Sequence, residues 1–335
     1  TGLRVAGEGQ AQGFDPSLWW AAAPRAQIDA RAQMRLTAPP STDWPLRSVA
    51  AWQALRGQAR VELLGPSQVA GVPLQGTLTA DGREPGWAVD VDLRAATSTA
   101  RLQGRLAPRA DDDRWQLAVD APALAALKPL LAALRSGPVV DGLAGALVAD
   151  VQVLGRWPAL RTQGSLRADA LRAGPVGAQR LAARWQAGPD RAAALAVTID
   201  GERVALGDAG FDTLRASVDG SLAAHTLAVD ASTALRPPAW TDTLTGSGAA
   251  PGSRVKLRAD GRWQAAPAVA ATASTPSAPS TPSAKSSGPT ARSPAPVPAP
   301  LPMAGQWQAR VTELDARGRD AAQPWFSARD VTLQA

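Results

Sequence analysis

The stretch VADVQVLGRWPALRTQGSLRADAL, from Val148 to Leu171, contains the pattern that decides the fold. Its apolar residues fall on alternate positions, with Val151 and Val153 before a Gly- and Pro-containing turn and Leu166 after it. A period of two is typical of a β-strand that buries one face. The stretch therefore predicts two antiparallel strands joined by a short turn.

The same alternation recurs along most of the chain, between turn signals such as LGPSQ, AGPDR and ADGRW. In WAVDVDLRA, for example, Trp87, Val89 and Val91 fall on one side and the charged residues on the other. Because the connections are short, neighbouring strands should pair antiparallel. We therefore predict an all-β fold, a long antiparallel meander of about fifteen or more strands with one or two short helices.

Two stretches depart from this period. STDWPLRSVAAWQALRG, residues 41–57, has Pro45 in its first turn and Gly57 at its end. APALAALKPLLAALRSGP, residues 121–138, is rich in Ala and Leu, and Pro129 is expected to kink or split it. We expect each stretch to form a short helix beside the sheet.

Residues 266–302 are nearly all Ala, Pro, Ser and Thr, which predicts a disordered insert. Strand-like sequence flanks this segment, so we expect a β-repeat region at 1–265 and a continuation of the same sheet at 303–335. The alternative is a linker between two domains. Because the sequence begins and ends in strand-like stretches, we expect a piece of a longer chain, with any membrane anchor outside it.

Charge and composition argue against nucleic-acid binding and against thiol chemistry. The chain has 35 Lys and Arg against 29 Asp and Glu, a net charge of +6. The Arg residues alternate with acidic residues on polar strand positions, which is typical of a solvated sheet face and not of a nucleic-acid surface. The absence of Cys excludes disulfides and thiol catalysis.

Residues that carry catalytic chemistry are scarce. His225 is the only His, and no G-x-S-x-G motif lies near it. Metal sites of the His and Cys type are therefore excluded, and no Gly-rich phosphate loop precedes a Lys. The run Asp111–Asp113 lacks the spacing of a calcium loop, and we expect it to be a solvated turn. We predict that the protein is not an enzyme and has no catalytic residue, cofactor or metal.

The chain contains 12 Trp residues. Trp87, Trp115 and Trp185 fall on the apolar sides of their strands, so we expect them to line a core or a groove and not to form a nucleic-acid platform. The adjacent Trp19 and Trp20 are expected to form a corner between two strands.

The apolar face of such a meander must be buried against something, and two short helices are too small to bury it. The sheet should either close onto a second sheet or curl into an open groove, which would suit acyl chains or an unpaired β-strand. The alternative for each inward residue is ordinary core packing. The residues that we predict to face the groove are Leu117, Val119, Leu147, Val151, Val153, Leu166, Leu195, Val197, Ile199, Leu227 and Val229.

Short motifs recur in an order that resembles a known family. After a G-x-L step, the turn carries Gly155, Pro158 and Leu160, and a second step follows at Gly164 and Leu166. Similar steps follow around His225 and in GQWQARVTELDA. Over about residues 102–335 the chain resembles the periplasmic strand repeats of the TamB translocation and assembly subunit family.

The resemblance implies a taco-like sheet with a hydrophobic groove, related to AsmA-like and bridge-like lipid-transfer proteins. It implies a periplasmic segment of an inner-membrane-anchored protein that moves phospholipids or assembles outer-membrane proteins such as autotransporters. The implied partners are phospholipid acyl chains and, through regions outside this chain, a TamA-like outer-membrane barrel; nucleic acid is not among them. The insert at 266–302 departs from the family pattern. The alternative is a structural or adhesive secreted β-solenoid with a closed core.

Overall fold

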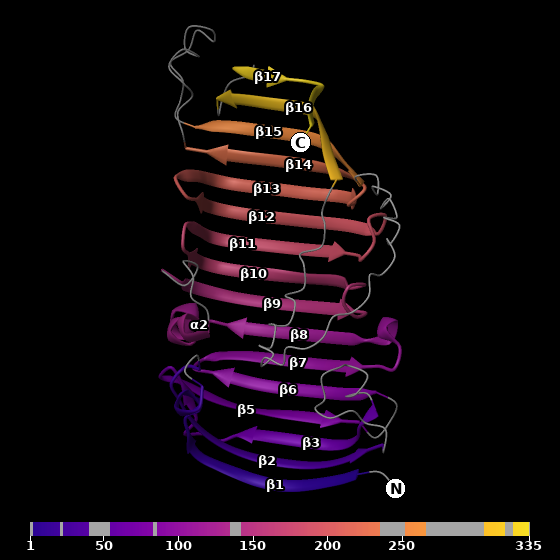
Figure 1. The fold of residues 1–335 in the computed structure, drawn as a ribbon. Helices are drawn as coiled ribbons and strands as arrows, with labels where there is room; N and C mark the ends of the chain where they lie inside the picture. The colour runs from indigo at the N-terminus through magenta and orange to yellow at the C-terminus, as the bar shows by residue number, and fades with distance from the viewer. Residues whose placement is uncertain are drawn as a thin grey trace, which may run out of the picture.

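The computed structural model describes residues 3–20, 23–39, 54–82, 86–134, 142–234, 252–265, 305–318 and 324–334. Within these ranges the chain forms an 18-stranded sheet with one α-helix and three short 3-10 helices. Figure 1 shows the strands stacked as a column in chain order, with clear curvature in β1, β2 and β3. The predicted all-β antiparallel meander is therefore confirmed.

Fifteen of the described strands have eight or more residues. They are β1 (Leu3–Phe14), β2 (Ala26–Ala38), β3 (Arg56–Leu63), β5 (Val72–Asp81), β6 (Trp87–Ala95), β7 (Ser98–Leu106), β8 (Arg114–Ala121), β9 (Ala144–Leu154), β10 (Arg161–Ala173), β11 (Val176–Ala187), β12 (Ala194–Leu206), β13 (Ala209–Ser221), β14 (Ala224–Thr233), β15 (Ser253–Ala265) and β16 (Gly305–Gly318). The short strands are β4 (Gln68–Val69), β17 (Phe326–Ala328) and β18 (Val331–Gln334).

Each long strand pairs antiparallel with the next long strand along the chain. At one edge, β16 pairs with β17 and β18 along different parts of its length. At the other edge, the only pairing of β1 within the described ranges is with β2. The hydrogen bonds of the described strands thus leave the sheet open and do not close it into a barrel.

The helix predicted around Pro129 is confirmed, and it is divided into two helical segments, as the proline predicts. A 3-10 helix, η3 (Leu124–Leu127), is followed by α2 (Lys128–Leu134), and Pro129 is the second residue of α2. Proline is tolerated there because its missing N–H would have no helical partner in the first turn. The other 3-10 helices are η1 (Pro16–Leu18) and η2 (Ala110–Asp112). None of the helices in the described ranges is long and apolar enough to cross a membrane.

The helix predicted over residues 41–57 lies mostly outside the described residues, but its expected end at Gly57 is wrong. Gly57 is the second residue of β3 and has a φ of 138°. A Cβ at this position would collide with the carbonyl oxygen of Arg35 on the paired strand β2. Glycine is therefore needed for a close backbone approach between two strands and not for a helix terminus.

The strands on either side of the predicted insert are neighbours. β15 and β16 pair along their whole length, with Ala265 opposite Gly305. The segment between these two residues therefore connects adjacent strands of one sheet. The prediction of disorder for 266–302 lies outside the described residues.

Few large side chains are fully buried. Eleven of the sixteen buried apolar residues in the described part of the chain are Ala. One small cluster joins Ala38, Leu55 and Trp87, with Leu36, Ala80 and Leu106 packed against it. The sheet therefore has no large closed core among these residues, and most of its big apolar side chains lie on a partly exposed surface.

The turn between β6 and β7 offers a test of backbone strain. Ala96 has a φ of 51°, in the left-handed region that costs a residue with a Cβ about 1–2 kcal/mol. Ala96→Gly should raise the free energy of unfolding by about 0.5–1 kcal/mol, after allowance for the larger entropy of Gly in the unfolded chain. Urea denaturation would measure this gain. The exposed Ala88 of β6 is the control, and Ala88→Gly should instead lower stability by about 0.5–1 kcal/mol. If both variants lose stability, Ala96 is not strained.

Candidate functional site

The candidate site is one face of the sheet, here called the apolar face. Its central row crosses the sheet from β1 to β17 through directly opposed residues, and each of its sixteen members is apolar or Gly. In order they are Ala11, Ala30, Leu63, Gly76, Leu93, Ala100, Val119, Ala149, Leu166, Ala183, Ile199, Ala216, Val229, Leu257, Leu314 and Ala328.

A second row is equally apolar; it lies two residues away along each long strand from β1 to β15, three residues away on β16 because of a bulge, and ends on β18. Its members are Gly9, Ala32, Val61, Leu78, Val91, Leu102, Leu117, Val151, Gly164, Trp185, Val197, Val218, Leu227, Ala259, Val311 and Val331. A third row beyond it has Thr162 and His225 as its polar members, among residues such as Trp115, Val153 and Leu195. A fourth row, on the other side of the central row, runs from Ala121 and Leu147 to Ala316 and Phe326.

All eleven residues predicted to face a groove lie on this apolar face. Val119, Leu166, Ile199 and Val229 are in the central row, and Leu117, Val151, Val197 and Leu227 are in the second row. Val153 and Leu195 belong to the third row, and Leu147 belongs to the fourth. The prediction missed the N-terminal half of the same rows, including Leu63, Val91 and Leu102, although the same alternation marks them.

The eleven residues are all partly exposed, and none of them is fully buried. Nearer the N-terminal edge the face is more open still, because Met34 on β2 is 45% exposed and Leu78 on β5 is 38% exposed. Strand spacings make the four rows about 20 Å wide and the fifteen long strands about 70 Å long. Among the described residues, the apolar face is therefore a continuous and partly exposed strip.

The sequence Q-G-x-L recurs at Gln75–Leu78, Gln103–Leu106 and Gln163–Leu166, and the glycines of the last two copies leave room for a Trp of the neighbouring strand. The ring of Trp115 lies where a Cβ on Gly104 would be, and Trp185 Cζ2 lies 2.5 Å from a Cβ built on Gly164. His225 covers Gly261 in the same way. A ring that lies across a cross-strand glycine shields the exposed backbone of that glycine. This packing explains a repeat that the sequence alone showed only as a motif.

The opposite face of the sheet is polar. Five exposed Gln residues on β7 to β11 lie directly beside one another across the strands: Gln103, Gln116, Gln152, Gln163 and Gln186. Gln163 Nε2 donates a hydrogen bond of 2.8 Å to Gln152 Oε1. This glutamine ladder was not predicted, because its members come from different motifs and only the strand register brings them together. It lies on the solvated face, whereas the ladders of a closed solenoid would lie inside.

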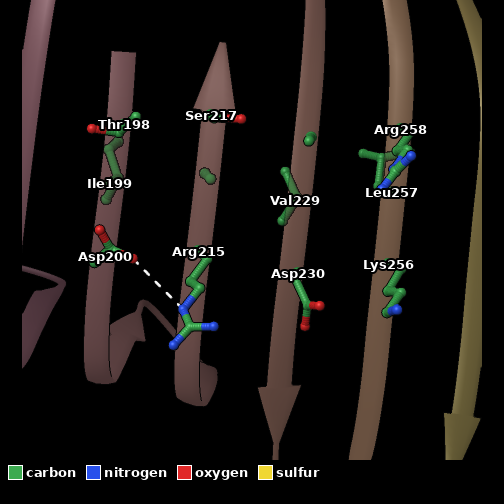
Figure 2. Close-up of a pocket in the computed structure, with 12 residues that line it drawn as sticks. Thr198, Ile199, Asp200, Arg215, Ser217, Val229, Asp230, Lys256, Leu257 and Arg258 are labelled. Atoms are coloured by element: carbon green, nitrogen blue, oxygen red, sulfur yellow. Dashed lines mark ion pairs between the residues drawn. The ribbon is translucent and has the colours of Figure 1, made fainter.

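A depression of about 260 Å³ lies over β12 to β15, and Figure 2 shows the residues that border it. Cross-strand pairs place Asp200, Arg215, Asp230 and Lys256 side by side, so their charges alternate in sign. Asp200 Oδ1 lies 3.7 Å from Arg215 Nε. Hydrogen bonds from Arg254 hold the pKa of Asp230 below its ordinary value, against the opposing effect of burial. Asp200 is ion-paired with Arg215 and Asp230 with Arg254, and these cross-strand pairs favour the observed register.

The prediction that Asp111–Asp113 is a solvated turn is wrong for Asp113. Its side chain is 2% exposed and forms an ion pair with Arg156, with 2.7 Å between Asp113 Oδ2 and Arg156 Nε. Asp113 Oδ1 also accepts a hydrogen bond from the backbone N–H of Ala107. The carboxylate is therefore a buried structural link between the β7–β8 turn and the β9–β10 turn.

The described ranges hold no cluster of three His, Asp or Glu residues that could bind a metal ion. His225 Nδ1 lies 3.2 Å from the carbonyl oxygen of Ser221, at the border of the apolar face.

The fold and the site define a class of protein: an open, antiparallel β-meander with one continuous apolar face and one charged face. Comparison of the chain with protein-family models, with curated proteins and with solved structures finds no match.

Proposed function

We propose that this chain is a periplasmic segment of an inner-membrane-anchored protein, and that its apolar face guides phospholipids toward the outer membrane or assists the assembly of outer-membrane proteins such as autotransporters. The observation that supports this proposal is the continuity of the central and second rows, which cross the long strands without a charged residue. The resemblance of its repeats to those of the TamB family supports it independently.

The mechanism would be binding and sliding, with no covalent step. Burial of an acyl chain contributes about 0.8 kcal/mol per CH₂ group. Because every long strand presents apolar residues or Gly in the central and second rows, an acyl chain would meet apolar surface at each of these strands. A lipid could then move along the strip without a large barrier. Contact with a TamA-like outer-membrane barrel would be made by regions outside this chain.

The test is native mass spectrometry, with lipid extraction, on the chain purified from a bacterial periplasm. We expect phospholipid to co-purify with the parent chain. Substitution of Val151, Val197 and Val229 by Asp on the apolar face should remove most of this lipid, because each Asp places a charge against the acyl chain.

The matched control carries Asp at the next residue of each strand, where the side chain points to the polar face: Gln152→Asp, Thr198→Asp and Ala228→Asp. This control should keep its lipid, and circular dichroism should show that both triple variants remain folded. Equal lipid content in the two triple variants would reject the apolar face as the binding surface. A lipid-free parent whose apolar-face variant unfolds would favour the β-solenoid with a closed core.

A further inference from the structure

The turn between β1 and β2 exposes three large apolar side chains in succession. Leu18 is 82% exposed, Trp19 is 74% exposed and Trp20 is 64% exposed. Isolated apolar side chains are common on protein surfaces, but a contiguous group of this size marks an interaction site. The sequence indicated only a corner between strands at this place, and the proposed function of the apolar face does not use it.

Hydrogen bonds fix the backbone of the described residues that lead into and out of this turn. The Asp15 carboxylate accepts hydrogen bonds from the backbone N–H groups of Ser17, at 2.9 Å, and Ala26, at 3.2 Å. The hydrogen bonds from Ser17 hold the pKa of Asp15 below its ordinary value. The backbone N–H groups of Trp19 and Trp20 both donate to the carbonyl oxygen of Pro16, at 3.0 Å. The three exposed side chains therefore follow backbone whose N–H groups donate within the turn: those of Leu18, Trp19 and Trp20 all do so.

We propose that this turn contacts a lipid bilayer, with Leu18, Trp19 and Trp20 inserted at the boundary between headgroups and acyl chains. Leu18 is the last residue of η1, and Trp19 and Trp20 follow it directly at the end of a turn. A bilayer surrounds an inserted turn and can bury all of them. Trp is well suited to this boundary because its indole is apolar and also has an N–H group.

Two further features favour a bilayer. A turn that satisfies its own backbone groups can enter a headgroup layer without leaving polar groups unpaired. Arg25, which is exposed where the turn returns to β2, is a cation suited to anionic headgroups. The contact would lie at a rim of the sheet and is independent of lipid binding on the apolar face.

The test is flotation of the full chain with vesicles of phosphatidylethanolamine and phosphatidylglycerol. The parent chain should float with the vesicles, and the L18S/W19S/W20S variant should partition at least about tenfold less, because its apolar contact area is lost. High salt should change the partitioning of the parent by less than about threefold, because the contact is mainly apolar.

The matched control is Trp157→Ser, because Trp157 is 69% exposed and lies in the β9–β10 turn at the opposite rim. It should float like the parent, within about twofold, if a single exposed Trp contributes little. The proposal is overturned if the parent does not float, as expected for a turn that binds another protein. It is also overturned if L18S/W19S/W20S floats like the parent or if Trp157→Ser loses as much. The apolar-face variant of Val151, Val197 and Val229 should still float, which separates a failure here from a failure of the proposed function.

Discussion

Replacement of Asp113 by Ala should lower the free energy of unfolding by about 3–5 kcal/mol, because it leaves a largely buried cation without its partner. Asp113 Oδ1 accepts hydrogen bonds from Ala107 N at 2.6 Å and from Arg156 Nη2 at 2.9 Å. Arg156 Nη2 also donates to the carbonyl oxygen of Ala107 at 2.9 Å. Loss of the carboxylate would remove an acceptor of the Ala107 N–H group and leave the guanidinium with the Ala107 carbonyl but without its counter-charge.

The measurement is urea denaturation, combined with amide hydrogen exchange in β7 to β10. Strands of a meander contact mainly their neighbours, so the loss of protection should concentrate there and unfolding need not be two-state. Asp92 provides the control, because it pairs with Arg101 at a similar distance of 2.8 Å, with the two side chains 47% and 71% exposed. Asp92→Ala should cost less than about 1 kcal/mol. Similar losses for both variants would contradict the importance of burial at Asp113.

Substitution of Gly164 by Val should lower stability by about 2–3 kcal/mol, because the new side chain overpacks a filled position. A Cβ there would lie 2.5 Å from Trp185 Cζ2 and 2.6 Å from the carbonyl oxygen of Asp150. Trp185 could rotate away, but the Asp150 carbonyl belongs to the paired strand β9 and cannot move without disturbing the ladder. Thermal denaturation followed by Trp fluorescence would report both the loss of stability and the displacement of the indole.

Gly9 is the matched control, because it lies in the same row of the apolar face and a Cβ there meets no atom within 4 Å. Gly9→Val should change stability by no more than about 0.5 kcal/mol. Combining Gly164→Val with Trp185→Ala should recover only part of the loss, since the clash with the Asp150 carbonyl remains. Full recovery in the double variant would show that the indole alone sets the requirement for glycine.

The strand assignments could be predicted because alternation along a strand is a local property. Val197 and Ile199 face one side and Thr198 faces the other whatever the partner strands are. The position of α2 was also local, since Pro129 breaks a helical stretch by its own geometry. The role of Gly57 could not be predicted from its neighbours in the sequence. Glycine is needed there because a Cβ would collide with the carbonyl oxygen of Arg35 on another strand.

The sequence by itself determined that this protein is an all-β meander, and it determined which side chains share a face of each strand. Only the tertiary structure decided which residues stand side by side across strands. That register aligns the apolar rows without a charged interruption, assembles the glutamine ladder, and brings Arg156 to Asp113. The physical reason is that a period of two specifies the side to which a residue points, whereas register depends on turn lengths and cross-strand packing between residues far apart in the chain.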